Sequence, residues 1–266
     1  MVRSKNRRQA RGRRILLMTL LIFCTVFLWP VLSDKIKQNT AAIPASAAPE
    51  SQTSSETQAE APTETSEKTE TTQTSDIDAA KDSEYLLLIN KENPLPKGYV
   101  PGDLQQVASS ASAVNGQKMR AVPAAALEQL SKSAAQEGYT IKLVSGYRSY
   151  SLQKELYTMY VKQDGKYVAE QYSARPGYSE HQAGLAADVS SPSAGYDLLQ
   201  SYGNTAEGKW LAKNAHRFGF IIRYLKGKED ITGYLYEPWH LRYVGTEAAT
   251  EIYEQQLTLE EYLEKK

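Results

Sequence analysis

The chain is organised around one stretch, Tyr178-Ser179-Glu180-His181-Gln182-Ala183-Gly184-Leu185-Ala186-Ala187-Asp188-Val189. Two side chains in it, those of His181 and Asp188, can bind a metal, and a small, glycine-containing linker joins them. The stretch runs into an apolar segment, residues 185–190, which has the pattern of a strand. Because side chains alternate along a strand, Asp188 points to one face, and Ala187 and Val189 point to the other. We expect Gly184 to let the backbone turn, so that His181 folds back toward Asp188.

A third candidate ligand follows in the run Tyr236-Glu237-Pro238-Trp239-His240-Leu241-Arg242-Tyr243. His181, Asp188 and His240 make a three-ligand set, the number that catalytic zinc sites use while they leave a fourth position for water. Structural zinc sites are closed by four ligands, mostly Cys, and the chain contains one Cys. A closed thiolate site is therefore excluded.

The second run also holds a carboxylate, Glu237, three positions before His240. An unbroken strand would point these two side chains apart. Pro238 between them predicts a bend that brings both toward one cavity. His240 is then the third ligand, and Glu237 is an unligated carboxylate that can act as a base.

A third polar element, Ser145-Gly146-Tyr147-Arg148-Ser149, follows one expected strand and opens an expected helix. Arg148 can hold an oxyanion or a terminal carboxylate through its rigid fork of donors. Gln153, one turn into that helix, either shares this task or lies on a solvated face of the helix.

The first part of the chain has a composition of its own. Residues 1–14 carry basic side chains and no acidic ones, and residues 15–32 are apolar apart from two threonines. This apolar run lies at the short end of what spans a bilayer as a helix. A cleavable signal peptide has a shorter apolar core and a prompt small-residue cleavage site, so we favour an uncleaved signal-anchor. The basic head then stays in the cytoplasm, and everything after residue 32 lies outside the cell membrane.

Residues 33–84 are rich in Ser, Thr, Glu and Pro. They have too few large apolar side chains to offset the entropy of ordering, which predicts a disordered tether. The whole chain has 31 basic and 31 acidic residues, and the part beyond the tether is also neutral. The positive surface expected of a nucleic-acid-binding protein is therefore missing. The expected contact with a membrane runs through the N-terminal helix alone.

Residues 85–266 have the size of one domain. We expect strands at residues 85–89, 140–145, 185–190, 220–224 and 239–244, and helices over residues 123–138, 149–160 and 205–218. Thr246 and Thr258 are candidate helix caps, and Thr258 with Glu261 fits a capping box. The strands are short and several alternate, which favours an α+β domain with a small antiparallel sheet flanked by helices.

Together the three motifs resemble the zinc D-alanyl-D-alanine carboxypeptidases of the VanY type, including the related L,D-carboxypeptidases of Gram-positive cell walls. The resemblance covers most of residues 86–245 and rests on motifs that stand in the same order and spacing. It implies a Hedgehog/DD-peptidase-like fold. One departure is Leu225, where the family often has proline after Arg-Tyr, and it lies outside the motifs. The motifs are Ser179-x-His181-x-x-Gly184-x-Ala186-x-Asp188, Glu237-x-Trp239-His240 and Ser145-Gly146-Tyr147-Arg148-Ser149.

The resemblance also implies roles. One zinc ion per domain is bound by three ligands, Glu237 is the catalytic base, and Arg148 stabilises the transition state. The substrate is a peptidoglycan stem peptide that loses its terminal D-alanine, from either a D-Ala or an L-residue. The zinc ligands that it implies are His181, Asp188 and His240, and the residues that line the peptide site are Arg120, Ser145, Gln153 and Ser179.

Other functional classes stay open at this point. A non-catalytic zinc-containing wall-binding or signalling module is the main alternative, as in Hedgehog-type relatives of the fold. Glu237 speaks against it, since a binding module would be free to lose its base. A serine or cysteine peptidase is weaker, because the one Cys lies in the apolar run and no Gly-x-Ser-x-Gly is present in residues 85–266. The third histidine, His216, is interpreted as a surface or hydrogen-bonded residue.

Overall fold

A computed structural model describes residues 84–265 of the chain. The expected basic head, the signal-anchor and all but the last residue of the tether lie outside the described residues. Within residues 84–265, no helix is both long and apolar enough to cross a membrane. The elements that follow all belong to this described part.

The fold mixes short strands with helices, as expected for an α+β domain. The strands are β1 (Leu104–Gln106), β2 (Lys118–Arg120), β3 (Lys142–Ser145), β4 (Ala186–Ser190), β5 (Phe220–Tyr224) and β6 (Glu237–Tyr243). The α-helices are α3 (Ala121–Gln136), α4 (Tyr150–Asp164), α5 (Lys166–Ala169), α6 (Ala206–Asn214), α7 (Glu229–Thr232), α8 (Thr246–Gln255) and α9 (Leu259–Glu264). Short 3₁₀ segments are η1 (Glu180–Ala183), η2 (Pro192–Ala194), η3 (Gln200–Asn204) and η4 (Ala215–Phe218).

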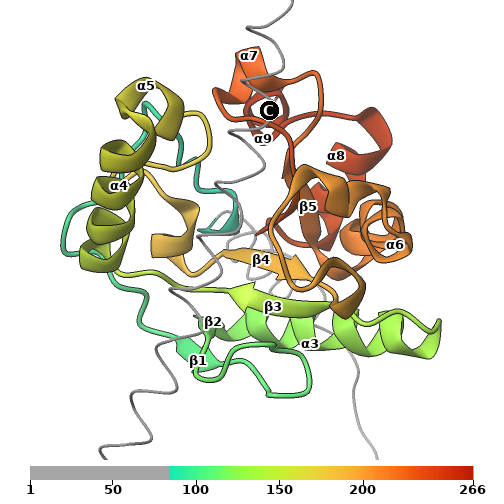
Figure 1. Ribbon diagram of the computed structural model, residues 1–266. Coiled ribbons are helices and arrows are strands. Elements are labelled where there is room, and N and C mark those ends of the chain that lie inside the picture. The colour runs from blue at the N-terminus through green and yellow to red at the C-terminus, as the bar shows by residue number, and fades with distance from the viewer. Residues whose placement is uncertain (1–83, 266) are drawn as a thin grey trace, which may run out of the picture. The chain divides into compact units, whose positions relative to one another are not determined.

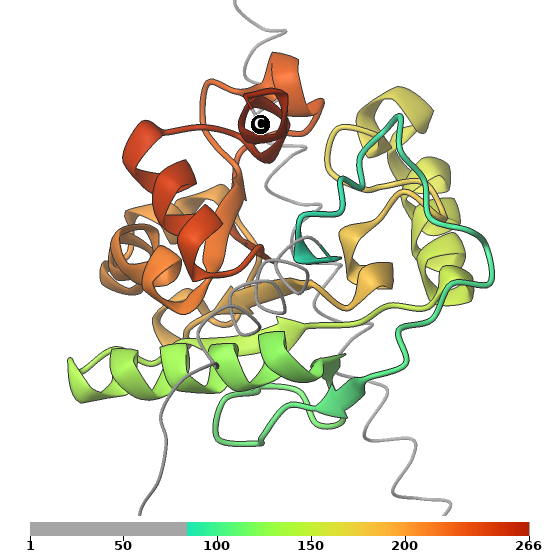
Figure 2. The same cartoon turned by 180° about the vertical axis from the view of Figure 1, so that it is seen from behind.

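Within the described residues the strands form two antiparallel sheets. One is the β1–β2 pair, and the other is four-stranded with the order β3-β4-β6-β5. Helix α3 runs along the side of β1, β2 and β3, whereas α4 and α5 lie on the opposite side of β4 from α6 and α8 (Figures 1 and 2). The two central strands, β4 and β6, come from distant parts of the sequence and carry the motif residues.

The core shows why these segments form strands and helices. Leu185, Ala187 and Val189 belong to the main apolar cluster, together with Leu241 of β6 and the buried side of α3. The predicted alternation along β4 is thus confirmed, although all five residues of β4 are buried. A second apolar cluster joins Ile221 and Val244 to residues of α8 and α9. The four-stranded sheet is therefore covered by apolar packing, and its other side chains build the site.

The expected strand at residues 85–89 is wrong. Residues 84–85 are helical and residue 86 is a turn. Tyr85 and Ile89 are nevertheless buried in the main core. The Nη2 atom of Arg242 donates hydrogen bonds to the carbonyls of Tyr85 (2.8 Å) and Leu87 (2.7 Å). These backbone acceptors are therefore used by a buried arginine rather than by a neighbouring strand.

The helix ends follow local chemistry in most places. Ser149 accepts a hydrogen bond from the backbone of Leu152 at the start of α4, and Thr205 does the same for α6. The predicted capping box of Thr258 and Glu261 is confirmed at the start of α9. The prediction for Thr246 is wrong, since α8 begins with this residue itself and Gly245 is the cap. The expected long helix after Thr205 is divided into α6 and the 3₁₀ segment η4.

Candidate metal centre and active site

Three candidate ligands from three elements meet at one point. His181 comes from η1, Asp188 from β4 and His240 from β6, and one ligand atom of each lies within 4.8 Å of the others. Asp188 and His240 are direct partners in the β4–β6 register. All three residues are buried. Two histidines and a carboxylate in this arrangement are a donor set that suits zinc and leaves a further position open.

A left-handed turn brings His181 back over the strand. Gly184 ends η1 with φ of 68°, a conformation that favours glycine. A Cβ at this position would also lie 3.0 Å from the Cγ atom of Arg120 and 3.2 Å from its backbone nitrogen. The turn leaves Nε2 of His181 3.2 Å from Oδ2 of Asp188. The structure therefore forms the turn that the sequence predicts at Gly184.

The two histidines turn different nitrogens toward this point. Nδ1 of His181 lies 2.7 Å from the carbonyl oxygen of Gly146, so Nδ1 carries the hydrogen and Nε2 keeps its lone pair. Nδ1 of His240 instead lies 3.0 Å from Oδ1 of Asp188. Nε2 of His181 is buried and has no hydrogen-bond partner among the described residues. A metal ion would give this nitrogen the partner that it lacks, so the residues present fit a zinc ion.

The charges of the cluster are set by burial and by close contacts. Burial, with a smaller effect from Arg148, lowers the pKa of His181 to about 4. Burial alone would also lower the pKa of His240, but the hydrogen bonds with Asp188 and Glu180 outweigh it and raise the value to about 9. His181 is thus neutral at neutral pH, as a metal ligand must be. His240 has to lose a proton when a metal binds.

Glu237 reaches the cluster through a break in the strand register. In the β5–β6 pair Ile222 faces Leu241, whereas Tyr224 faces Glu237, so β6 has extra residues between these pairs. This irregularity is the bend expected at Pro238. It brings Oε2 of Glu237 to 3.7 Å from Nδ1 of His240. Burial is the main cause that raises the pKa of Glu237 to about 8.

Arg148 contacts Asp188 at Oδ2, the oxygen that also faces His181. Its Nη2 atom is 3.3 Å from Oδ2 of Asp188, and its Nη1 atom donates to Oε1 of Gln153 at 3.2 Å. Gln153 is 1% exposed and also donates to the carbonyl of Ala174 at 2.8 Å. The solvated alternative for Gln153 is therefore wrong. The amide nitrogen of Gln153 is held by Ala174, and its amide oxygen accepts from Arg148, so Gln153 orients the guanidinium of Arg148.

Of the other residues predicted to line the peptide site, Ser145 and Ser179 adjoin the metal-ligand segments, whereas the guanidinium of Arg120 is turned to other partners. Ser145 pairs with Asp188 in the β3–β4 register and is half-buried, and Ser179 is buried at the start of η1. The guanidinium of Arg120 is taken up by Asp103 (2.9 Å) and Glu84 (3.0 Å). Arg120 meets the motif through its backbone nitrogen, which donates to the carbonyl of Gly184, and through the apolar stem of its side chain. The structure thus uses the side chain of Arg120 in ion pairs rather than at the metal ligands.

Glu180 is a residue of the site that the sequence patterns did not predict. Glu180 stands next to His181 and is 2% exposed, and its carboxylate faces Arg223, Arg242 and His240. Its position directly before a ligand was the one available signal. An isolated glutamate in a sequence is usually solvated, and both arginines lie far along the chain.

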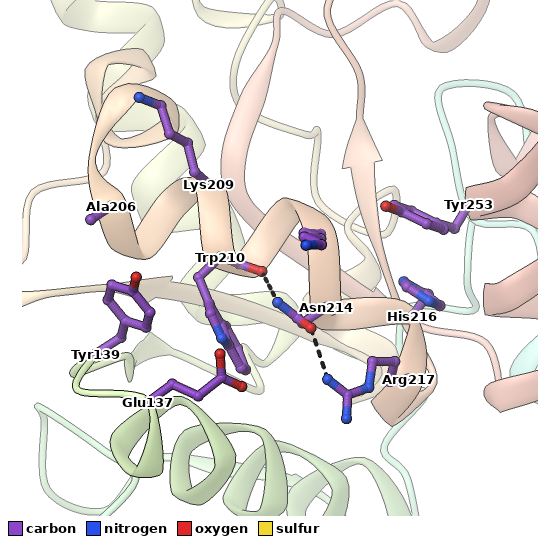
Figure 3. A pocket seen from close by; sticks show the side chains of 10 residues that line it. Glu137, Tyr139, Ala206, Lys209, Trp210, Asn214, His216, Arg217 and Tyr253 are labelled. Atoms are coloured by element: carbon purple, nitrogen blue, oxygen red, sulfur yellow. Dashed lines mark hydrogen bonds between the residues drawn. The ribbon is translucent and has the colours of Figure 1, made fainter.

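His216 lies outside the metal cluster. It lines a pocket formed by α6, η4, α8 and the residues after α3, and Trp210 and Arg217 lie in the same lining (Figure 3). Its ring stacks on that of Tyr253, with centroids 3.9 Å apart and an angle of 8° between the planes. Trp239 is partly buried and packs against the main core.

Comparison with known proteins agrees with this geometry. The family model of VanY, D-alanyl-D-alanine carboxypeptidase, matches residues 116–246. The chain is 49% identical over 183 residues to the protein YodJ of Bacillus subtilis (strain 168), a match that covers 68% of this chain and 67% of YodJ.

Two solved structures are also similar. The LdcB LD-carboxypeptidase is 46% identical with a TM-score of 0.65, and the match covers 69% of this chain and 87% of LdcB. A mutant of the vancomycin-resistance D,D-pentapeptidase VanY in complex with Zn(II) is 39% identical with a TM-score of 0.58, over 68% of this chain and 99% of that one.

Proposed function

This chain belongs to the VanY family of D-alanyl-D-alanine carboxypeptidases, and we propose that it uses one zinc ion to remove the C-terminal D-alanine from peptidoglycan stem peptides. The observation that carries the proposal is the meeting of three separate motifs at one buried point. His181, Asp188 and His240 supply the ligands, Glu237 lies 3.7 Å from His240, and Arg148 lies 3.3 Å from Asp188.

Zinc held by these ligands would polarise the scissile carbonyl, lower the pKa of water and favour the carboxylate form of Glu237. Glu237 accepts a proton from the attacking water at its carboxylate. The water oxygen bonds to the carbonyl carbon, the peptide C–N bond breaks, and Glu237 returns the proton to the amine of the leaving D-alanine. Arg148 directs its donors at the oxygen on which negative charge develops, or at the terminal carboxylate.

The position of Glu237 favours catalysis over a purely binding role. A binding module needs the ligands but has no use for a buried carboxylate beside them. Glu237 is 6% exposed, and burial raises its pKa to about 8. Burying a carboxyl group costs free energy unless it is hydrogen-bonded or paired, so a buried glutamate beside the ligands is better explained by a catalytic role than by stability. The structure has no corresponding observation in favour of a non-catalytic module.

The bond that is cut is the finer part of the proposal. Identity with the LD-carboxypeptidase LdcB is 46%, against 39% with the D,D-pentapeptidase VanY. This difference supports tetrapeptides, in which D-alanine follows an L-residue, as the preferred substrate. Both LD- and D,D-enzymes are among the relatives, so the two bonds have to be compared directly.

The test is incubation of the purified protein with a stem tetrapeptide and a stem pentapeptide, followed by mass spectrometry. We expect the loss of one alanine, faster from the tetrapeptide, and no loss after zinc has been removed by a chelator. Adding zinc back should restore the reaction. Release of alanine at the full rate by metal-free protein, or no release from either peptide, would show that the proposal is wrong.

We also propose that residues 15–32 anchor the protein in the cell membrane, with the catalytic domain on the wall side and residues 33–84 as its tether. The support is the basic head followed by an apolar run in the sequence. The native protein should sediment with membranes, and external protease should release an active fragment. Recovery of the protein mainly from the culture medium would instead indicate a cleaved signal peptide.

A further inference from the structure

Glu180 is the centre of a buried ion network beside the metal ligands. Its Oε1 atom accepts hydrogen bonds from Nε of Arg223 and from Nη1 of Arg242, both at 2.7 Å. Its Oε2 atom lies 3.4 Å from Nε2 of His240. The two oxygens of one carboxylate therefore have different neighbours, two cations on one and a zinc-ligand histidine on the other.

The carboxylate of Glu180 cannot turn, because the arginines that hold it are themselves fixed. Both arginines are fully buried. Arg242 also donates to the carbonyls of Tyr85 and Leu87. Arg223 forms a bidentate salt bridge with Glu260, with N–O distances of 2.7 and 2.8 Å. Two buried guanidinium groups donate to Glu180 at 2.7 Å, and these opposite charges keep its carboxylate ionised. Glu180 is thus an ion that only accepts hydrogen bonds.

This fixed acceptor decides which nitrogen of His240 is free. A neutral imidazole carries one hydrogen, and a lone pair on Nε2 would face the negative oxygen of Glu180 and be repelled by it. The distance of 3.4 Å is at the long end for a hydrogen bond, yet the repulsion acts at that range. Asp188 lies nearer, with Oδ1 3.0 Å from Nδ1 of His240, but a zinc ion bound to Asp188 would take up its negative charge. With zinc bound, the hydrogen of a neutral His240 therefore belongs on Nε2, and Nδ1 is left with a lone pair for the metal.

We propose that Glu180, held by Arg223 and Arg242, is a positioning residue that fixes the tautomer of His240 and so presents Nδ1 to zinc. Carboxylates that accept from a ligating histidine commonly do this in zinc sites. Here the carboxylate comes from the residue directly before the other histidine ligand, His181, so η1 carries one ligand and the group that orients the other. The inference rests on the proposed zinc function and names the residue that makes His240 a competent ligand.

The substitution Glu180→Gln tests this sharply, since an amide has one acceptor end and one donor end. The two arginine donors require the amide oxygen at the position of Oε1. The NH₂ group must then face Nε2 of His240, which becomes an acceptor, and the hydrogen of a neutral His240 moves to Nδ1. We expect zinc affinity, measured by competition with a chromogenic chelator, to fall about 10–100-fold.

A control separates this effect from a general loss of stability. Glu260→Gln weakens the same network, because Glu260 pairs with Arg223 through both of its oxygens. Among the contacts in the described part of the chain, those of Glu260 do not include His240. We expect Glu260→Gln also to lower the urea midpoint, because it weakens the pairing of Arg223, while changing zinc affinity by less than about twofold. Equal losses of zinc affinity in both variants would overturn the proposal.

The tautomer itself can be measured in the zinc-loaded wild-type protein, whether or not a variant folds. The chain has three histidines, so ¹⁵N labelling of histidine gives few signals, and His216→Gln identifies one residue. We expect His240 to keep its hydrogen on Nε2 and His181 to keep its hydrogen on Nδ1. Zinc bound through Nε2 of His240 would overturn the positioning role and leave the carboxypeptidase function intact. Failure of the wild-type protein to bind zinc would overturn both.

Discussion

Asp188 and Glu237 are two buried carboxylates of one site, and their surroundings move their pKa values in opposite directions. Burial would raise the pKa of Asp188, but contacts with His181 and His240 outweigh it and hold the value well below the usual range. Burial raises the pKa of Glu237 to about 8. Such a separation divides the roles, with one group permanently charged and suited to bind a metal, and the other able to exchange a proton.

A prediction at this scale concerns Glu237. Because it is the base and not a ligand, Glu237→Gln should keep stoichiometric zinc while turnover falls by a factor of about 100 or more. Elemental analysis and single-turnover kinetics on the same preparation measure the two effects. Glu261→Gln, which removes a carboxylate paired with Lys228 at the surface, should leave both unchanged. Joint loss of zinc and activity in Glu237→Gln would make Glu237 a ligand.

At the scale of elements, the loop after β3 connects the parts of the site. The backbone nitrogen of Gly146 donates a hydrogen bond to Oε1 of Gln117, and its carbonyl accepts one from Nδ1 of His181. The backbone nitrogen of Arg148 donates to the carbonyl of His181. Residues of β3, η1 and the start of α4 are thereby held at fixed distances. Backbone groups make these contacts, so the position of the loop depends on close approach between backbone segments.

A substitution in that loop tests the close approach. A Cβ at position 146 would lie 2.4 Å from the carbonyl oxygen of Lys118, so the backbone has to shift. Gly146→Ala should cost about 1–3 kcal/mol of unfolding free energy. It should also weaken zinc binding, because the acceptor of His181 moves. Urea unfolding and a zinc titration provide the measurements.

Gly102→Ala is the matched control, because nothing in the described part of the chain lies within 4 Å of a Cβ there. It should change stability by less than about 0.5 kcal/mol and leave zinc binding intact. If Gly146→Ala were as stable as this control, the loop would be more adaptable than its contacts indicate.

At the scale of the whole described domain, tyrosines fill much of the interior. The chain has 18 of them, and several combine burial with a raised pKa. Burial is the main cause for each member of this group, which comprises Tyr202, Tyr224 and Tyr234. These phenols keep their hydrogen in the folded protein at a pH where the unfolded chain loses it.

This predicts loss of stability in alkali. An unfolded tyrosine has a pKa of about 10. The stabilising contribution is therefore complete below that pH, and it is lost as the pH rises further, because only the unfolded state then releases protons. The urea midpoint should fall steeply between pH about 10 and 11, and tyrosinate absorbance should follow unfolding.

Two tyrosine variants are the controls for that experiment. Tyr202→Phe should make the pH dependence of the urea midpoint weaker, because it removes a buried phenol. Tyr167→Phe should not change it, since Tyr167 is 81% exposed. A midpoint that stays constant across this interval in the wild-type protein would contradict the prediction.

Local patterns in the sequence determined much of the fold. The alternation along β4, the bounds of β5 and the capping box of α9 all depend on neighbouring residues. The same holds for the turn at Gly184, because glycine adopts a left-handed conformation without strain. The ligand residues were evident too, since few residue types bind zinc and their motifs are short.

Only the tertiary structure decided how these pieces are connected. The order β3-β4-β6-β5, the buried role of Gln153 and the ion pairs of Arg120 join residues that are distant in the sequence. The clearest case is Glu180 of η1, whose carboxylate meets Arg223 of β5 and Arg242 of β6. A buried charge is stable only where its partners converge. That convergence is a property of the packed sheet, and no local pattern around Glu180 encodes it.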